Sequence, residues 1–213
     1  MNFYAEHDTD KVIREKYFPD YDYKGTIVEV GAATPDLIST TKHFKENGWR
    51  AIHIEPNPDF VKLHKECGNE IYEYACGEID KDDVDFTIVS QKTNDASNVN
   101  YMTDHAFSSF SVKKEYIDLH EEFFEKLKKS VIKVKCRKLD TIIKELNLNK
   151  IDVLSIDTEG WEIEVMKGLT LIRPELIILE NLLQQESYTE YMSSIDYELV
   201  HIQESLNYFY KKK

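Results

Sequence analysis

The stretch Ile151–Gly168, IDVLSIDTEGWEIEVMKG, constrains the fold more than any other part of the chain. It begins with the mostly apolar IDVLSI, which is too short for a helix and fits a buried strand of a parallel sheet. In the following segment the apolar residues Trp161, Val165 and Leu169 recur every four positions, as on one face of a helix. A strand that leads directly into a helix is the repeating unit of α/β proteins, so we expect that fold class.

Two carboxylates, Asp157 and Glu159, follow this strand. The carboxyl ends of strands in an open α/β sheet form the crevice where ligands bind, so both residues are candidates for catalysis. The alternative is a structural role, in which Asp157 or Thr158 caps the helix and Glu159 stabilises its positive end by ~1 kcal/mol. Capping explains one acidic residue better than a pair followed by Gly160.

The rest of the chain alternates between segments with strand and helix patterns. The expected strands are Thr26–Val30, Ala51–Ile54, Ile71–Ala75, Val84–Val89, Val131–Cys136, Leu176–Leu179 and a closing antiparallel pair, Tyr197–His201 with Tyr208–Tyr210. The expected helices are Asp10–Phe18, Leu37–Asn47, Asp59–Cys67, Tyr116–Lys129, Leu139–Leu146 and Glu186–Ile195. The first half therefore reads β-α-β-α-β, which predicts a parallel sheet.

Length and composition predict one globular domain over residues 1–213, of which 1–24 form a helical extension and 91–111 a polar lid or substrate loop. The formal charge of −13 disfavours nucleic acid and anionic membranes as partners. The three cysteines have no metal-type spacing, and no apolar run reaches membrane-spanning length. These features lead us to expect a cytoplasmic protein with reduced thiols and no membrane span.

Two further strand ends carry residues suited to ligand binding. Glu29 and Gly31 lie around the turn after the first expected strand, where a glycine lets the backbone approach a ligand closely. Glu55 ends the second strand, 24 residues after Gly31, near the spacing at which an acidic residue holds ribose hydroxyls in a βαβ unit. Ala33 and Asp36 replace the other glycines of the dinucleotide fingerprint G-x-G-x-x-G. The alternative for Glu55 is an exposed turn residue.

Four segments together carry a family resemblance: VEVGAATPD, NGWRAIHIEPNPDF, YACGE and SIDTEGWEIEVMKGL. In order and spacing they resemble the FkbM-type S-adenosylmethionine-dependent methyltransferases, over roughly Lys16 to Asn181. The resemblance implies a Rossmann-like class I methyltransferase fold. That fold has a seven-stranded, mostly parallel sheet with one antiparallel strand and helices on both faces.

The resemblance also implies which residues contact S-adenosylmethionine. Glu29 and Gly31 would lie at its methionine end and Glu55 at its ribose, while Ala75 and Cys76 would pass near the adenine. The complete expected cofactor-binding set is Glu29, Gly31, Ala32, Asp36, Glu55, Pro56, Asn57, Ala75, Cys76, Ser109 and Asp157. The chain departs from many relatives at Thr34-Pro35-Asp36, where they carry a second glycine or an acidic-glycine pair.

The family acts mostly on hydroxyl groups of small molecules, so the resemblance implies O-methylation of a small acceptor, a sugar or glycan first. The acceptor hydroxyl must lose a proton, either to a base or through a metal ion. Asp157, Glu159 and His105 of the polar loop are the candidate bases. Asp157, Glu180 and Asn181 are a candidate Mg²⁺ set that resembles catechol-type O-methyltransferases, although metal-free catalysis is the default.

Two other function classes remain open. An NAD oxidoreductase of the Rossmann type would share Glu55 but should show the three-glycine turn, which this sequence lacks. A binding module that kept the fold and lost catalysis would retain cofactor affinity without transferring a methyl group. Titration with S-adenosylmethionine and with NAD separates the first alternative from a methyltransferase.

Overall fold

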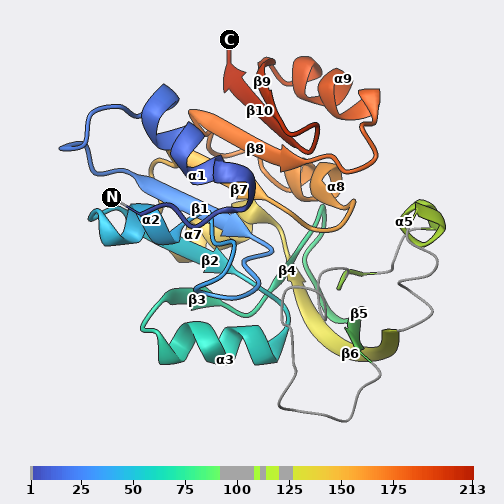
Figure 1. The fold of residues 1–213 in the computed structure, drawn as a ribbon. Coiled ribbons are helices and arrows are strands. Elements are labelled where there is room, and N and C mark those ends of the chain that lie inside the picture. The colour runs from blue at the N-terminus through green and yellow to red at the C-terminus, as the bar shows by residue number, and fades with distance from the viewer. Residues whose placement is uncertain (1, 92–107, 111–113, 120–126) are drawn as a thin grey trace.

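A computed structural model describes residues 2–91, 108–110, 114–119 and 127–213. Its centre is a seven-stranded sheet with helices packed against it (Figure 1). The strands in chain order are β1 (Thr26–Val30), β2 (Arg50–Ile54), β3 (Glu70–Tyr72), β7 (Val153–Ile156), β8 (Leu176–Glu180), β9 (Tyr197–Gln203) and β10 (Asn207–Lys212). Their spatial order is β3-β2-β1-β7-β8-β10-β9.

The sheet is mostly parallel, as predicted. Strand β1 pairs in parallel with β2 and β7, and the register places Val30 beside both Ile54 and Ile156. Strand β10 runs antiparallel to its neighbours β8 and β9. The chain runs outward from β1 to β3 on one side and from β7 to β8 on the other. The order therefore reverses between β1 and β7, which is where ligands bind in open α/β sheets.

The strands have a buried core on each face of the sheet. Val28 and Leu154 point into one core, whereas Ile27 and Val153, their neighbours in sequence, point into the other. The first core is covered by α7 (Leu139–Glu145), α8 (Glu162–Lys167) and α9 (Glu186–Ser194). The second is covered by the helical turn η2 (Ile13–Tyr17) and by α2 (Lys42–Glu46). Alternation along each strand thus explains the continuous apolar runs in the sequence.

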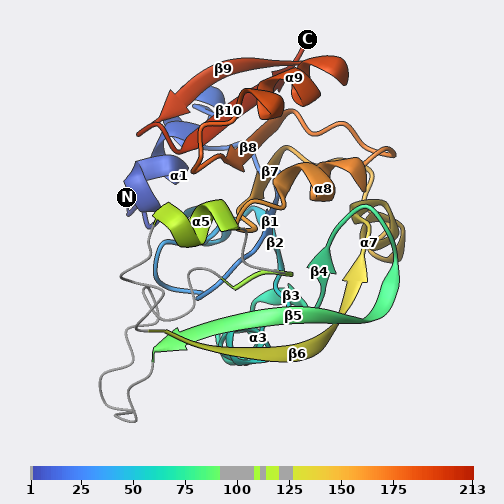
Figure 2. The ribbon, with the colours of Figure 1, turned by 90° about the vertical axis from the view of Figure 1, so that its right-hand side faces the viewer.

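A second, three-stranded sheet lies beside the first. It consists of β4 (Ala75–Cys76), β5 (Lys81–Gln91) and β6 (Leu127–Arg137), in the order β4-β6-β5. Strands β5 and β6 form a long antiparallel arm (Figure 2), whereas β4 pairs only with Cys136 and Arg137 at the end of β6. Helices α3 (Pro58–Glu66) and α5 (Lys114–Leu119) complete the described elements outside the N-terminal segment.

Two sequence predictions are wrong in this region. The single strand expected over Ile71–Ala75 is divided, because its two ends pair with different sheets. The helix expected over Tyr116–Lys129 extends too far, since residues 127–129 belong to β6. Val131 to Arg137 alternates between apolar and basic side chains, and pairing with β5 carries the strand back to Leu127. Residues 120–126 lie outside the described part of the chain.

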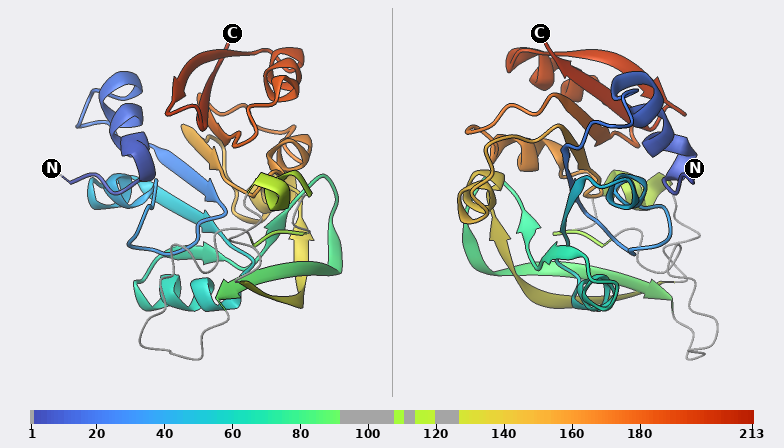
Figure 3. Two further views of the ribbon diagram at one scale, coloured as in Figure 1. Left: turned by 45° about the vertical axis from the view of Figure 1, so that its right-hand side comes forward. Right: turned by 90° about the vertical axis from the view of Figure 1, so that its left-hand side faces the viewer.

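The helix expected over Asp10–Phe18 is present over residues 9–17, as α1 (Thr9–Val12) followed directly by η2. The short turn η1 (Glu6–Asp8), with left-handed backbone at His7 and Asp8, precedes it in the N-terminal segment. This segment lies beside β9 and β10 (Figure 3), where Gln203 donates a hydrogen bond to the carbonyl of His7 and Asn207 donates one to Thr9 Oγ1. None of the helices in the described residues combines the length and the apolar character needed to cross a membrane.

Arg14 in η2 is fully buried, and its three guanidinium nitrogens have no hydrogen-bond partner among the described residues. Its guanidinium lies 4.1 Å from the centre of the Tyr21 ring. Because that contact offsets only part of the cost of burying a charge, we expect Arg14→Met to leave the free energy of unfolding unchanged or to raise it by about 1 to 3 kcal/mol. Urea denaturation measures this change.

The matched control is Ile13→Ala, in the neighbouring and equally buried residue. It should cost about 2 to 5 kcal/mol because it leaves a cavity. A comparable loss in Arg14→Met would mean that the guanidinium stabilises the fold.

Candidate functional site

Four carboxylates lie at the carboxyl ends of four adjacent strands. Glu29 is the penultimate residue of β1, Glu55 follows β2, Asp157 follows β7 and Glu180 ends β8. Since these strands are parallel and neighbouring, their acids gather at one edge of the sheet. Each acid was singled out in the sequence, and the pairing of the strands explains why they meet.

The turn after β1 passes unusually close to the end of β7. Gly31 has φ of 82°, and its amide donates to the carbonyl of Ile54 at 2.9 Å. A Cβ atom on Gly31 would lie 1.8 Å from the backbone oxygen of Asp157. Any side chain at position 31 would therefore push β1 and β7 apart where they end.

Glu29 and Glu55 are both buried and hydrogen-bonded. Glu29 accepts from the amide of Thr40 at 2.9 Å and from Thr41 Oγ1 at 2.8 Å. Glu55 accepts from the amides of Ala33 at 3.0 Å and Asn57 at 2.8 Å. Burial dominates over these hydrogen bonds and raises the pKa of each carboxyl to about 7. Each group is therefore close to half-protonated at neutral pH.

Glu162 organises the turn that follows Asp157. It is fully buried, and its Oε1 accepts from the amides of Thr158 at 2.8 Å and Gly160 at 3.1 Å. Its Oε2 accepts from the hydroxyl of Tyr188. Helix α8 has Trp161 at its N-cap without a side-chain cap bond. The capping role considered for Asp157 and Thr158 is therefore wrong, because Glu162 satisfies this turn instead.

Asp157 does not cap this helix and lines both cavities, and its side chain is hydrogen-bonded to Glu180 and to the backbone of Glu159. A large part of its side chain remains accessible, yet the surrounding protein desolvates it and raises its pKa to about 7, with the charge of Glu162 adding to the effect. Desolvation also raises the pKa of Glu159 and of Glu180 well above the usual range, and the charge on Asp157 contributes to both shifts. The strand ends thus form a group of acids that hold protons readily.

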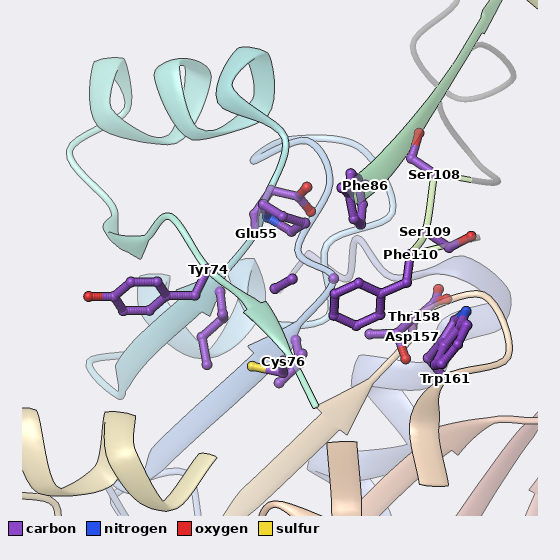
Figure 4. A pocket seen from close by; sticks show the side chains of 15 residues that line it. Glu55, Tyr74, Cys76, Phe86, Ser108, Ser109, Phe110, Asp157, Thr158 and Trp161 are labelled. Atoms are coloured by element: carbon purple, nitrogen blue, oxygen red, sulfur yellow. The ribbon is translucent and has the colours of Figure 1, made fainter. Parts of the chain in front are cut away.

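Two cavities meet at this edge of the sheet. The aromatic cavity contains about 390 Å³ of space, and Figure 4 shows Phe110 between Glu55 and Trp161 within it. The residues that line this cavity include Glu55, Tyr74, Cys76, Ser109, Phe110 and Trp161. The Ser109 side chain is buried, and its hydroxyl has no hydrogen-bond partner among the described residues. That hydroxyl is available to a ligand.

The acidic cavity contains about 550 Å³ of space on the other side of the Gly31 turn. Glu6, Glu29, Asp157 and Glu180 line it, together with Thr9, Asn207 and the small residues of the turn. Gly31 and Asp157 line both cavities. The pair therefore suits an elongated ligand with a flat ring at one end and a positively charged group at the other.

Most residues of the expected cofactor-binding set line the two cavities. Glu29, Gly31, Ala32, Glu55, Pro56, Ala75, Cys76, Ser109 and Asp157 line one or both of them. Their roles toward a cofactor stay predictions. Glu159 lies near Asp157, whose charge raises its pKa, but it does not line either cavity. His105 lies outside the described residues.

Three expected site residues have other positions. Asp36 is exposed and pairs with Lys42 at 2.7 Å, outside both cavities. Asn57 is fully buried and caps α3 by accepting from the amide of Asp59 at 3.1 Å. Asn181 is buried too, and its side chain exchanges two hydrogen bonds with the backbone of Gln185. Each of these residues makes local contacts, and its role toward a cofactor or a metal stays a prediction.

The metal set expected from the sequence does not assemble as predicted. Oxygens of Asp157, Glu162 and Glu180 lie within 4.8 Å of one another. Glu162 is occupied by the turn and by Tyr188, and Asn181 by Gln185. Asp157 and Glu180 are the remaining carboxylates of the expected group. The residues present therefore do not fit the three-oxygen magnesium site.

Sequence reasoning missed Glu6, Thr9 and Asn207, which line the acidic cavity from the two ends of the chain. Nothing in their local sequence marks them. They arrive there because the N-terminal segment lies against β9 and β10. The sequence pattern placed Trp161 on the apolar face of a helix, whereas its edge-to-face contact with Phe110, with ring centres 5.4 Å apart, depends on the fold.

The raised pKa of Glu29 and Glu55 predicts a pH dependence of stability. Both carboxyls hold a proton in the folded state up to about pH 7, whereas in the unfolded chain they release it near their usual value of 4.5. Stability is therefore lost as pH rises through 7. We expect the free energy of unfolding to fall between pH 6.5 and 8 by about 1 kcal/mol for each carboxyl. Urea denaturation of the ligand-free protein measures this slope.

The window begins at pH 6.5 because burial lowers the pKa of His53 and His64, which oppose the trend only at lower pH. The control is Glu55→Gln, which should remove its share of the slope. An unchanged slope in this variant would contradict the assignment.

Gly31→Ala should destabilise the protein far more than Gly68→Ala. Both glycines have positive φ, but a Cβ on Gly68 meets nothing within 4 Å. Gly68→Ala therefore costs only the backbone strain, about 1 kcal/mol, whereas Gly31→Ala adds the collision with Asp157 and should cost at least about 2 kcal/mol more. Thermal denaturation of both variants checks the difference. Equal losses would mean that the two strand ends separate easily.

A family of known proteins matches most of this chain. The family described as Methyltransferase FkbM domain matches residues 29–210, which include every strand of the central sheet except the first residues of β1 and the end of β10. The crystal structure of Methyltransferase FkbM from Methylobacillus flagellatus KT is similar, at 14% identity and a TM-score of 0.46. The match covers 92% of this chain and 46% of that one. Among curated proteins, none matches. The match over residues 29–210 shows that this chain belongs to the FkbM methyltransferase domain family.

Proposed function

We propose that this chain is an S-adenosylmethionine-dependent methyltransferase of Rossmann-like fold that methylates a hydroxyl group of a small acceptor. Membership of the family supports methyl transfer, and methyltransferases of this family generally use that donor. The observation that carries the proposal is a pair of neighbouring cavities at the carboxyl ends of β1, β2 and β7, which share Gly31 and Asp157 and have acids at each strand end.

The two cavities fit the parts of the donor. The aromatic cavity would hold the adenosine, with the buried Glu55 binding the ribose hydroxyls and Ser109, whose hydroxyl has no partner among the described residues, available to the ligand. The acidic cavity would hold the methionine end, with Glu29 binding its ammonium group. Gly31 joins the two and lets the backbone approach the chain between them. The bound donor supplies an electrophilic methyl group on a positively charged sulfur.

Asp157 is the residue best placed to take the acceptor's proton. It lines both cavities and so lies where the two parts of the donor meet. Its pKa of about 7 gives a carboxylate that is more basic than an ordinary aspartate at neutral pH. Asp157 also orients the acceptor hydroxyl by accepting its hydrogen bond, which aligns the nucleophile for displacement in line with the leaving sulfur.

The charge of the acidic cavity restricts the acceptor class. Asp157 and Glu180 place negative charge beside the reacting hydroxyl, so an acceptor that carries a phosphate there would be repelled. A neutral hydroxylated molecule avoids that cost. A sugar or glycan carries many hydroxyl groups and no charge, so it is the first acceptor class to test.

A magnesium ion is not part of this proposal, because Glu162 and Asn181 already make other hydrogen bonds. A dinucleotide cofactor is disfavoured by chemistry. Its pyrophosphate would lie on the Gly31 turn beside Glu29 and Asp157, both acids.

Incubating the protein with methyl-labelled donor and a panel of sugars, phenols, alcohols and amines tests the proposal. We expect label to transfer to a hydroxylated acceptor, and Asp157→Asn to lower kcat by about 100-fold or more at saturating donor. Asp36→Asn is the matched control, since it removes one acid from outside both cavities. It should leave kcat unchanged.

Three results would overturn the proposal. Nearly full activity of the Asp157→Asn variant would exclude Asp157 as the base. Donor binding without transfer to any acceptor in the panel would favour the inactive binding module. Absence of donor binding by calorimetry would exclude the proposed cofactor.

A further inference from the structure

The N-terminal segment, residues 2–12, forms one wall of the acidic cavity. Glu6 and Thr9 line that cavity, together with the acids of the strand ends. The segment is attached on both sides: Ala5 forms a parallel bridge with Ile38, and Gln203 donates to the carbonyl of His7 at 2.9 Å. Glu6 is thus held at the cavity by backbone contacts that do not involve its own side chain.

The Glu6 carboxylate acts on the other acids through space. Its charge raises the pKa of Asp157 and of Glu159, in addition to the effect of burial. Glu6 is itself about half exposed, and its side chain lies 3.5 Å from the Nε2 atom of His7. It supplies negative charge to the cavity without being part of the buried hydrogen-bonded core.

The resulting cavity is lined by four carboxylates, on Glu6, Glu29, Asp157 and Glu180, and by no basic side chain among the described residues. A ligand in this space gains Coulomb energy from each positive charge it carries. Methyl transfer changes that charge. A donor bound there would give its methyl group to the acceptor oxygen, whose proton would pass to Asp157. The donor's sulfur would keep the electron pair of the broken bond and become a neutral thioether.

We propose that Glu6 is a specificity-determining residue that makes the cavity bind the sulfonium donor more tightly than the demethylated product. This inference rests on the proposed function, because it assumes that S-adenosylmethionine occupies the two cavities. The donor carries one more positive charge than S-adenosylhomocysteine, and the two share every other group. Loss of that charge weakens the product's attraction to the acids and favours its release.

The test is isothermal calorimetry with three ligands: S-adenosylmethionine, S-adenosylhomocysteine and sinefungin, in which a carbon bearing a protonated amine replaces the methylated sulfur. Glu6→Gln should weaken binding of the donor and of sinefungin, which carry the extra positive charge, roughly threefold to tenfold more than it weakens binding of the product. Glu6→Asp, which keeps the charge, should retain most of the discrimination.

The matched control is Asp8→Asn. It removes the same charge from the same segment at a residue outside the cavity, and asparagine tolerates the left-handed backbone at that position. All three affinities should stay as in the unaltered protein. A measurement without variants gives a second readout: raising the salt concentration should weaken donor binding more than product binding.

The outcomes separate the two proposals. If the unaltered protein binds none of the three ligands, the proposed function fails and this inference fails with it. If it binds donor and product but Glu6→Gln leaves their ratio unchanged, or Asp8→Asn changes the ratio equally, the role of Glu6 is overturned while the proposed function stands.

Discussion

The close approach of the Gly31 turn to the backbone of Asp157 is the constraint on which the rest of the site depends. It occurs between β1 and β7, where the strand order of the sheet reverses. A residue without a side chain brings the two strand ends together and leaves a cavity on each side. The acids of β1, β2, β7 and β8 then face the same small region, and the burial that raises their pKa values follows from that convergence.

The acids at this edge have two different roles: some stabilise the local fold through hydrogen bonds, and others line the cavities. Glu162 is saturated by hydrogen bonds and stabilises the turn after β7, whereas Asp157, only five residues earlier, faces the cavities. Glu29 and Glu55 combine both characters, since each accepts two hydrogen bonds and yet lines a cavity. Burial of so many carboxyls costs folding free energy in the ligand-free protein. A cationic ligand would offset part of that cost. Functional sites commonly lower the stability of the ligand-free protein in this way.

The sequence predicted the parts of the fold that depend on local pattern. The apolar runs gave β1, β2, β7 and β8 with nearly correct ends, because strands buried on both faces leave an unmistakable composition. The acids at their ends were found for the same reason. The local contacts of Asp36, Asn57 and Asn181 could not be predicted, since a polar residue that serves the local fold looks the same in sequence as one that binds a ligand. Glu6 could not have been found, because only the packing of the N-terminal segment on β9 and β10 brings it to the cavity.

The arm formed by β5 and β6 has a consequence for solubility. Strand β4 covers β6 only at Cys136 and Arg137, so the remaining length of β6 has no strand paired to that edge among the described residues. Open edges of this kind invite pairing with another molecule. Lysines at positions 128, 129, 133 and 135 place like charges along the strand. Two such edges from separate molecules would repel each other, which protects the protein from edge-to-edge aggregation while keeping the arm extended.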